Sequence, residues 1–128
     1  MKSDKFIKIA IFFGTTGIIF GALASHTLAN YMSIEKIASF KTGVEYQIFN
    51  SLFLLIISLN LDKFNPKISN SINLISTGIL LFSFSIYFLA HQEILGINFS
   101  YLGPVTPLGG LLLIFGWVSV LFAIKKNH

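Results

Sequence analysis

Four long apolar runs constrain this chain more than any other feature of its sequence. They cover residues 6–24, 44–61, 72–90 and 107–124, and each holds 18 or 19 residues. At the α-helical rise such a run is about 27–29 Å long, close to the ~30 Å hydrocarbon core of a bilayer. Within that core only helices and closed barrels satisfy their own backbone groups, and four strands are too few to close a barrel. The sequence therefore predicts an all-α integral membrane bundle of four transmembrane helices, with residues 1–128 as a single domain.

The composition agrees with a surface that faces lipid. Hydrophobic residues make up 54% of the chain and charged residues 11%, and the mean hydropathy is +0.78. A soluble domain uses about 25% charged residues, so this chain has too few to cover a water-facing surface. The absence of cysteine excludes disulfides, thiolate metal sites and thiol nucleophiles. The net charge of +4 comes from lysines at the ends of apolar runs, which favours the lipid bilayer over nucleic acid as a partner.

The distribution of lysines predicts the orientation of the chain. Four predicted spans put the two termini and residues 62–70 on one side of the membrane, and residues 25–43 and 91–106 on the other. The first side carries seven lysines and the second two: Lys2, Lys5, Lys8, Lys63, Lys67, Lys125 and Lys126 against Lys36 and Lys41. Because positive charge gathers on the cytoplasmic side, we expect a multi-pass protein of the cell (inner) membrane with both termini cytoplasmic.

Small residues mark where the spans are expected to pack. Ala10, Gly14, Gly17, Gly21 and Ser25 lie within about 80° of one another on a helix, and residues 17–21 form a GxxxG pattern. Close packing inside one bundle is the favoured interpretation of this stripe, and homodimerisation is the alternative. The predicted helix-packing residues are Gly14, Gly17, Gly21, Gly109, Gly110 and Gly116.

Two helix starts have recognisable signals. In LGPVTPLGG (102–110), Thr106 is the predicted N-cap of the fourth span and Pro107 its first residue. Ser33 is the predicted N-cap of residues 33–50, an amphipathic interfacial helix that leads into the second span. Its predicted apolar face holds Ile34, Ile37, Phe40, Val44 and Ile48, and its polar face holds Glu35, Ser39, Thr42, Tyr46 and Asn50.

A group of polar residues is predicted at the outer ends of the spans. The candidate outer polar cluster consists of His26, Glu45, Gln47, Asn50, His91 and Thr106, with Glu93 nearby. The favoured interpretation is a hydrogen-bonded cap that holds span ends and loops, with no metal and no cofactor. A zinc or iron site built from His26, His91 and a carboxylate is an alternative, and a haem held by the two histidines is another.

Three motifs resemble one known family. The stretches GALASH at 21–26, TGVEYQIFN at 42–50 and LGPVTPLGG at 102–110, followed by Gly116-Trp117, are similar to proteins of the domain-of-unknown-function 423 (DUF423) family. The resemblance implies a four-helix inner-membrane protein without an assigned activity. This chain departs from the family pattern at Asn50, where the family commonly has histidine, and at Ala24-Ser25 before His26. Asparagine is a poor metal ligand, so Asn50 weakens the metal interpretation.

Three functional hypotheses follow. The first is a structural or accessory membrane component, not an enzyme, that packs with itself or with a larger membrane complex through the glycine stripe. The alternative is a small-solute or ion permease or channel that acts as an oligomer. Its path would follow a partial polar line of Ser76, Ser83, Tyr87, His91 and Asn50. An enzyme with His26 as base and Glu45 as its orienter ranks last.

Overall fold

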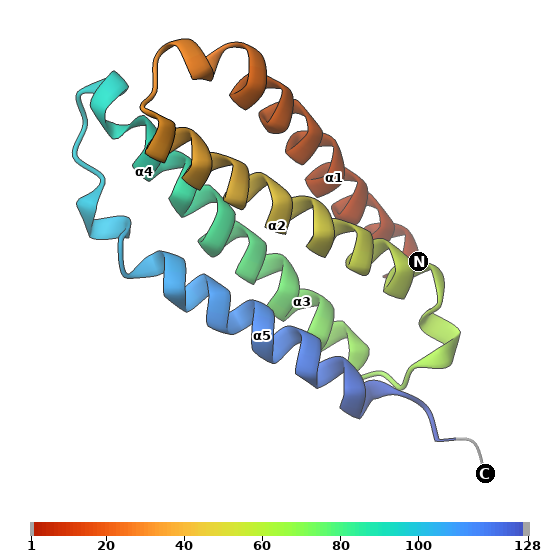
Figure 1. The fold of residues 1–128 in the computed structure, drawn as a ribbon. Helices are drawn as coiled ribbons and strands as arrows, with labels where there is room; N and C mark the ends of the chain where they lie inside the picture. The colour runs from red at the N-terminus through yellow and green to blue at the C-terminus, as the bar shows by residue number, and fades with distance from the viewer. Residues whose placement is uncertain (1, 127–128) are drawn as a thin grey trace.

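The computed structural model describes residues 2–126 of the chain as a bundle of long helices (Figure 1). The first two helices are α1 (Lys2–His26) and α2 (Ile34–Leu59). The third span combines α3 (Ile68–Ile79), the π-helical segment η3 (Leu80–Phe84) and α4 (Ser85–Leu95), and α5 (Val105–Ala123) is the fourth. Short 3₁₀ turns, namely η1 (Leu28–Asn30), η2 (Leu61–Lys63) and η4 (Ser100–Leu102), lie in the connections.

The four predicted spans are confirmed, and each is longer than its apolar run. The helical stretches that are long and apolar enough to cross a membrane are Lys2–Asn30, Ile34–Leu59, Ile68–Leu95 and Ser100–Ala123, of 29, 26, 28 and 24 residues. Helices extend past the hydrocarbon core because hydrogen bonding along the backbone continues into the interfacial layer, where charged side chains are tolerated. The described residues contain no β-strand, only an isolated bridge between Phe64 and Ile124.

The bundle consists of two helical hairpins. In one, α1 packs along α2, and in the other α5 packs along α3 and η3. The hairpins join where α2 lies beside the third span, so the helices follow one another as α1, α2, α3–α4 and α5 across the view of Figure 1. The larger buried cluster contains Phe13, Leu54, Ile72 and Ile75, and a smaller one near the α4 end contains Phe40 and Tyr87.

The start of α1, the end of α5 and the connection between α2 and α3 lie at the same end of the bundle (Figure 1). The backbone N–H of Asn65 donates to the Ala123 carbonyl at 2.7 Å, and that of Lys125 donates to the Lys63 carbonyl at 3.1 Å. These bonds tie the short connection to the end of α5. The seven lysines assigned above to one side of the membrane therefore belong to one end of the molecule.

The second helix runs without a break from its predicted N-cap. The Ser33 side chain accepts a hydrogen bond from the Lys36 backbone N–H at 3.2 Å, so this prediction is confirmed. The predicted faces are wrong at two positions: Ile34 is 88% exposed, and Asn50 is buried. The reason is that α2 packs against α1 on one side and against the third span on another, which buries more than a single apolar stripe. The interfacial position of its first turns stays a prediction.

The predicted N-cap of the fourth span is wrong. The helix α5 begins at Val105 with Pro104 as its N-cap, because Pro104 already has helical dihedral angles (φ −68°, ψ −18°). Pro107 still lies in the first turn, where its missing N–H removes no intrahelical bond. The Thr106 hydroxyl instead forms a hydrogen bond of 2.6 Å with the Ser85 hydroxyl, which joins α5 to α4.

Candidate functional site

A fully buried glutamine side chain links three helices in the middle of the bundle. Gln47 lies 13 residues into α2, about 20 Å from its start at the helical rise. Its Nε2 donates to the Phe13 carbonyl at 2.8 Å and to the Thr16 hydroxyl at 2.7 Å, both on α1. Its Oε1 accepts from the Tyr87 hydroxyl on α4 at 2.7 Å. Both amide donors are used, so the cost of burying this polar group is offset by three bonds.

The glycines of α1 let that helix approach the glutamine. A Cβ added at Gly17 would lie 2.8 Å from Cγ1 of Ile48 and 3.5 Å from Nε2 of Gln47. The neighbouring glycines of the stripe face Ser51 and Val44, also on α2. The three glycines of the stripe therefore face α2 within the bundle, which is the packing that the favoured interpretation expects.

Tyr87 is held by aromatic rings and by a second glycine. Its ring centroid lies 4.7 Å from that of Phe40 and 5.0 Å from that of Phe20. A Cβ at Gly43 would come within 2.9 Å of the tyrosine ring, so α2 can lie close to α4 only because that residue is glycine. The carbonyl of Gly43 also accepts a 2.8 Å bond from the Ser83 hydroxyl in η3. The phenol is thus fixed in position by packing and by its bond to Gln47.

The π-helical segment η3 receives the closest approach of α5. A Cβ at Gly109 would collide with the backbone nitrogen of Phe82 and lie 2.7 Å from the carbonyl carbon of Leu81. Further along α5, a Cβ at Gly116 would meet Cγ1 of Ile75 at 2.5 Å. A π-helical turn inside an α-helix is rare and is frequent at functional sites, and here it lies at the junction of α5 with the third span.

The six residues of the predicted outer polar cluster lie in separate environments. Gln47 belongs to the network above, and Thr106 pairs with Ser85. Asn50 accepts from the Trp117 indole N–H at 2.8 Å, and His91 Nδ1 lies 2.7 Å from the Tyr87 carbonyl oxygen. His26 and Glu45 are exposed. Residues 45 and 47 are about 200° apart around a helix, so they cannot share one face.

No three histidine or acidic side chains among residues 2–126 are grouped as a metal site would require. The polar line considered for a permease is also occupied by contacts within the bundle. Ser83 and Tyr87 bond to α2, and Asn50 bonds to α5. These bonds join neighbouring helices, and none of them favours a path for solute.

Sequence reasoning missed two partners, Thr16 and Trp117. Thr16 is a polar residue in the middle of the first apolar run, a signal that the sequence does contain. Gln47 is only the fourth residue of the second run, and its central position follows from the early start of α2 at Ile34. For Trp117 no such signal exists, because its partner Asn50 lies 67 residues away on a helix that is not its neighbour in the chain. The ring also stacks on Phe53, with centroids 3.6 Å apart and planes 4° from parallel.

The comparisons with known proteins agree with this architecture. A family described as "Protein of unknown function (DUF423)" matches residues 20–110, which is most of the chain. The chain belongs to the DUF423 family. The resemblance drawn from the three motifs is thereby confirmed, and no solved structure matches the chain.

Several relatives are named as membrane proteins. A UPF0382 membrane protein of Haemophilus influenzae is 30% identical over 124 residues, 97% of this chain and 96% of its own length. The UPF0382 membrane protein YwdK of Bacillus subtilis is 32% identical over 83% of this chain and 84% of its own. The UPF0382 inner membrane protein YgdD of Escherichia coli is 32% identical over 87% of this chain and 84% of its own. This DUF423 chain is therefore an integral membrane protein, and the names of these three relatives state no activity.

Proposed function

We propose that this DUF423 protein is a structural or accessory component of the membrane, not an enzyme, and that it assembles with a second copy or with a larger membrane complex. The observation that carries the proposal is that the buried polar side chains, with one exception, are hydrogen-bonded within the bundle. Among the described residues, Ser76 Oγ is the one buried side-chain nitrogen or oxygen without a hydrogen-bond partner. Gln47, Tyr87 and Asn50 are engaged in bonds between helices, which stabilise the bundle and leave no free acid, base or nucleophile among them.

The outer helices supply the surface for such an assembly. Exposed apolar side chains recur at heptad spacing on α1 and at three-, four- and seven-residue spacing on α5. They are Ile11, Phe12, Ile18 and Ile19 on α1, and Leu108, Leu111, Phe115 and Phe122 on α5. Side chains at these spacings form one stripe of a helix, which suits contact with lipid or with a further transmembrane helix.

Native mass spectrometry of the protein released in mild detergent tests this proposal. We expect a discrete oligomer or a co-purifying subunit in fixed ratio. A second sample with alanine at both Leu111 and Phe115 is expected to release that subunit. Leu52→Ala with Ile56→Ala, two exposed apolar residues of α2 outside this surface, is the matched control and should retain the subunit. A bare monomer in every preparation, also after extraction in native lipid discs, would overturn the proposal.

We further propose that both termini face the cytoplasm, as the lysine distribution supports. The chain has no cysteine, so single cysteines report sidedness directly. Ser100→Cys in η4 should react with a membrane-impermeant maleimide in intact cells. Asp62→Cys in η2, at the opposite end, should react only after permeabilisation. The reverse pattern would contradict the orientation.

A further inference from the structure

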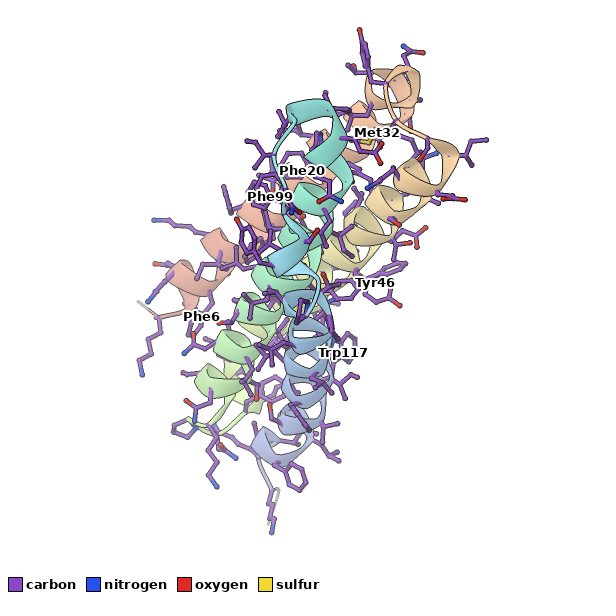
Figure 2. The ribbon with its side chains drawn as sticks, turned by 90° about the vertical axis from the view of Figure 1, so that its left-hand side faces the viewer. Phe6, Phe20, Met32, Tyr46, Phe99 and Trp117 are labelled. Atoms are coloured by element: carbon purple, nitrogen blue, oxygen red, sulfur yellow. The ribbon has the colours of Figure 1, made fainter. Side chains whose placement is uncertain are left out.

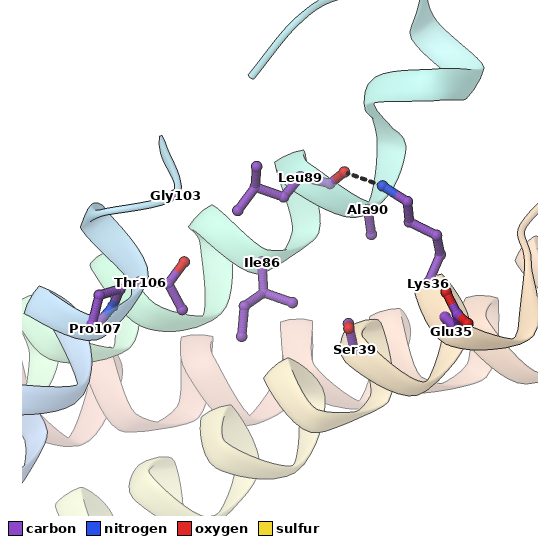
Figure 3. A pocket seen from close by; sticks show the side chains of 9 residues that line it. All are labelled: Glu35, Lys36, Ser39, Ile86, Leu89, Ala90, Gly103, Thr106 and Pro107. Atoms are coloured by element: carbon purple, nitrogen blue, oxygen red, sulfur yellow. Dashed lines mark hydrogen bonds between the residues drawn. The ribbon is translucent and has the colours of Figure 1, made fainter. Parts of the chain in front are cut away.

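Two cavities lie one after the other along a groove between α2 and α5. The first, drawn in Figure 3, has a volume of about 560 Å³ and is lined by the first turns of α2, by α4 and by the residues around the start of α5. These elements meet at the end of the bundle away from the start of α1 (Figure 1). The second has a volume of about 570 Å³ and lies nearer the middle of the bundle. Along α2, Glu35 and Ser39 line the first cavity, and Tyr46 and Asn50 line the second, all at helical spacing. Side chains at these spacings share one face, so the cavities have a common wall.

The second wall, formed by α5, and the floor, formed by the third span, also run from one cavity into the next. On α5 the first cavity ends at Pro107, and the second begins at Gly110, one turn further on. On the third span, Phe82 lines the second cavity and Ile86 the first, four residues apart. The two cavities are therefore successive parts of one groove that opens on the surface of the bundle. We call it the α2–α5 groove.

The end of the groove away from the termini carries both signs of charge. Figure 3 shows Lys36 reaching across to the third span, where its Nζ donates to the Leu89 carbonyl at 3.3 Å. An ammonium group has three donors, so two remain for a ligand. Glu35 lines the same cavity and is the residue next to Lys36. A headgroup that holds a phosphate and an ammonium matches this pair in charge.

The inner part of the groove is apolar and has fixed aromatic walls. Tyr46 stacks on Phe82, with ring centroids 4.9 Å apart and planes 16° from parallel. Trp117 stacks on Phe53 and is held by its bond to Asn50. Figure 2 shows Tyr46 and Trp117 on the same side of the bundle. Between these rings Gly110 contributes no side chain, which leaves the groove open for a narrow apolar ligand.

The length of the groove fits one leaflet. From residue 36 to residue 50 the α2 wall is about 21 Å long at the helical rise. Half of the ~30 Å hydrocarbon core is about 15 Å, so the wall spans one leaflet and part of the headgroup layer.

We propose that the α2–α5 groove binds one phospholipid with an aminoalkyl phosphate headgroup, of the phosphatidylethanolamine class. The lipid comes from the leaflet away from the termini. Its phosphate lies against Lys36 and its ammonium against Glu35. One acyl chain lies along Gly110, between Tyr46 and Trp117. This inference does not depend on the proposed accessory function.

Native mass spectrometry of the whole protein in mild detergent tests it, with phosphatidylethanolamine and phosphatidylglycerol added separately at equal concentration. We expect one retained phosphatidylethanolamine per chain and weaker retention of phosphatidylglycerol. In Lys36→Gln the affinity for phosphatidylethanolamine should fall about tenfold, the change expected for loss of one charge-assisted hydrogen bond. Lys41→Gln is the matched control, because Lys41 is exposed on the same helix and does not line the groove.

A second pair of variants tests the acyl part of the groove without disturbing the fold. A Cβ at Gly110 would lie 3.6 Å from the Phe82 ring, an ordinary contact, so Gly110→Leu fills the groove and should abolish retention of the lipid. Leu111→Phe adds bulk on α5 outside the groove and should retain it. Equal retention of the two lipids, or equal affinity in Lys36→Gln and Lys41→Gln, would overturn the proposal. The subunit number in the same spectra reports the assembly separately.

Discussion

Oε1 of Gln47 accepts a 2.7 Å hydrogen bond from the hydroxyl of Tyr87, so α2 and α4 are joined by a polar contact at the centre of the bundle. The same amide donates to Phe13 and Thr16 on α1. Hydrophobic burial drives helix association only weakly in lipid, where packing and polar contacts decide which helices pair. The Gln47 network therefore fixes the register between the two hairpins.

Replacing Tyr87 by Phe should measure how much its hydrogen bond to Gln47 contributes to the free energy of unfolding. The variant keeps the aromatic packing and leaves Oε1 of Gln47 buried without that partner, so the free energy of unfolding should fall by about 1 kcal/mol. Gln47→Leu should cost more, because it removes three bonds at once. Unfolding in mixed micelles of mild detergent and dodecyl sulfate measures both. In a double-mutant cycle the two costs should not add, and additive costs would contradict direct coupling.

Two serines of the third span form a matched pair for a second prediction. Ser76 Oγ is buried without a partner, whereas the Ser83 hydroxyl donates to the Gly43 carbonyl at 2.8 Å. Ser76→Ala should leave stability unchanged or raise it by up to about 1 kcal/mol, because an unsatisfied group is removed. Ser83→Ala should lower it by about 0.5–1.5 kcal/mol. Equal effects in the same unfolding assay would show that the Ser83 bond contributes nothing specific.

Neighbouring glycines on α5 should differ sharply in their tolerance of alanine. A Cβ at Gly109 meets the backbone of Leu81 and Phe82, which cannot move aside without shifting η3. A Cβ at Gly110 meets only the edge of the Phe82 ring at 3.6 Å. Gly109→Ala should therefore lower stability by several kcal/mol or prevent folding, as backbone overpacking does. Gly110→Ala should fold normally. Size-exclusion profiles and helicity by circular dichroism after purification distinguish these results.

The sequence predicts the spans well because span length and hydropathy are local properties of the chain. It also predicts that the glycines of α1 pack, since their spacing alone puts Gly14, Gly17 and Gly21 on one face. It fails at Asn50, Thr106 and the outer polar cluster for a common reason. Whether a side chain on a given face of a helix is buried, and what it contacts, depends on where the neighbouring helices lie. The helix α2 has neighbours on two sides. Treating 33–50 as a helix with one apolar face thus put Asn50 on the wrong side.

The glycine stripe of α1 gives a fourth prediction, which concerns the single chain. Gly17→Leu forces its side chain against Ile48 and the amide of Gln47, so it should weaken the α1–α2 contact inside each protomer. We expect lower stability and faster proteolysis of α1 even when the protein is diluted to a monomer. Ile18→Leu, an exposed neighbour, is the control. A loss of oligomer with unchanged monomer stability would instead favour the homodimer interpretation of the stripe.

Trp117 gives the last prediction because it is the chain's one tryptophan and it lines the α2–α5 groove. It lies 12 residues into α5, about 18 Å from the start of that helix, which is close to the end of an acyl chain from the nearer leaflet. Phosphatidylethanolamine with bromine near the end of its acyl chains should therefore quench Trp117 fluorescence at low mole fraction. Brominated phosphatidylglycerol should quench it less, although both lipids reach the exposed edge of the indole equally.

The difference in quenching between the two brominated lipids measures the contribution of the lipid bound in the groove, because the surrounding bilayer contributes equally with both. In Lys36→Gln this difference should disappear, because the contact that selects the headgroup is lost. The substitution does not act on the fluorophore directly, since residue 36 lies more than a dozen residues along α2 from Asn50, the hydrogen-bond partner of the indole. In Lys41→Gln it should persist. Equal quenching by the two lipids in the unmodified protein would mean that Trp117 meets only bulk lipid, and the groove would then have no preferred occupant.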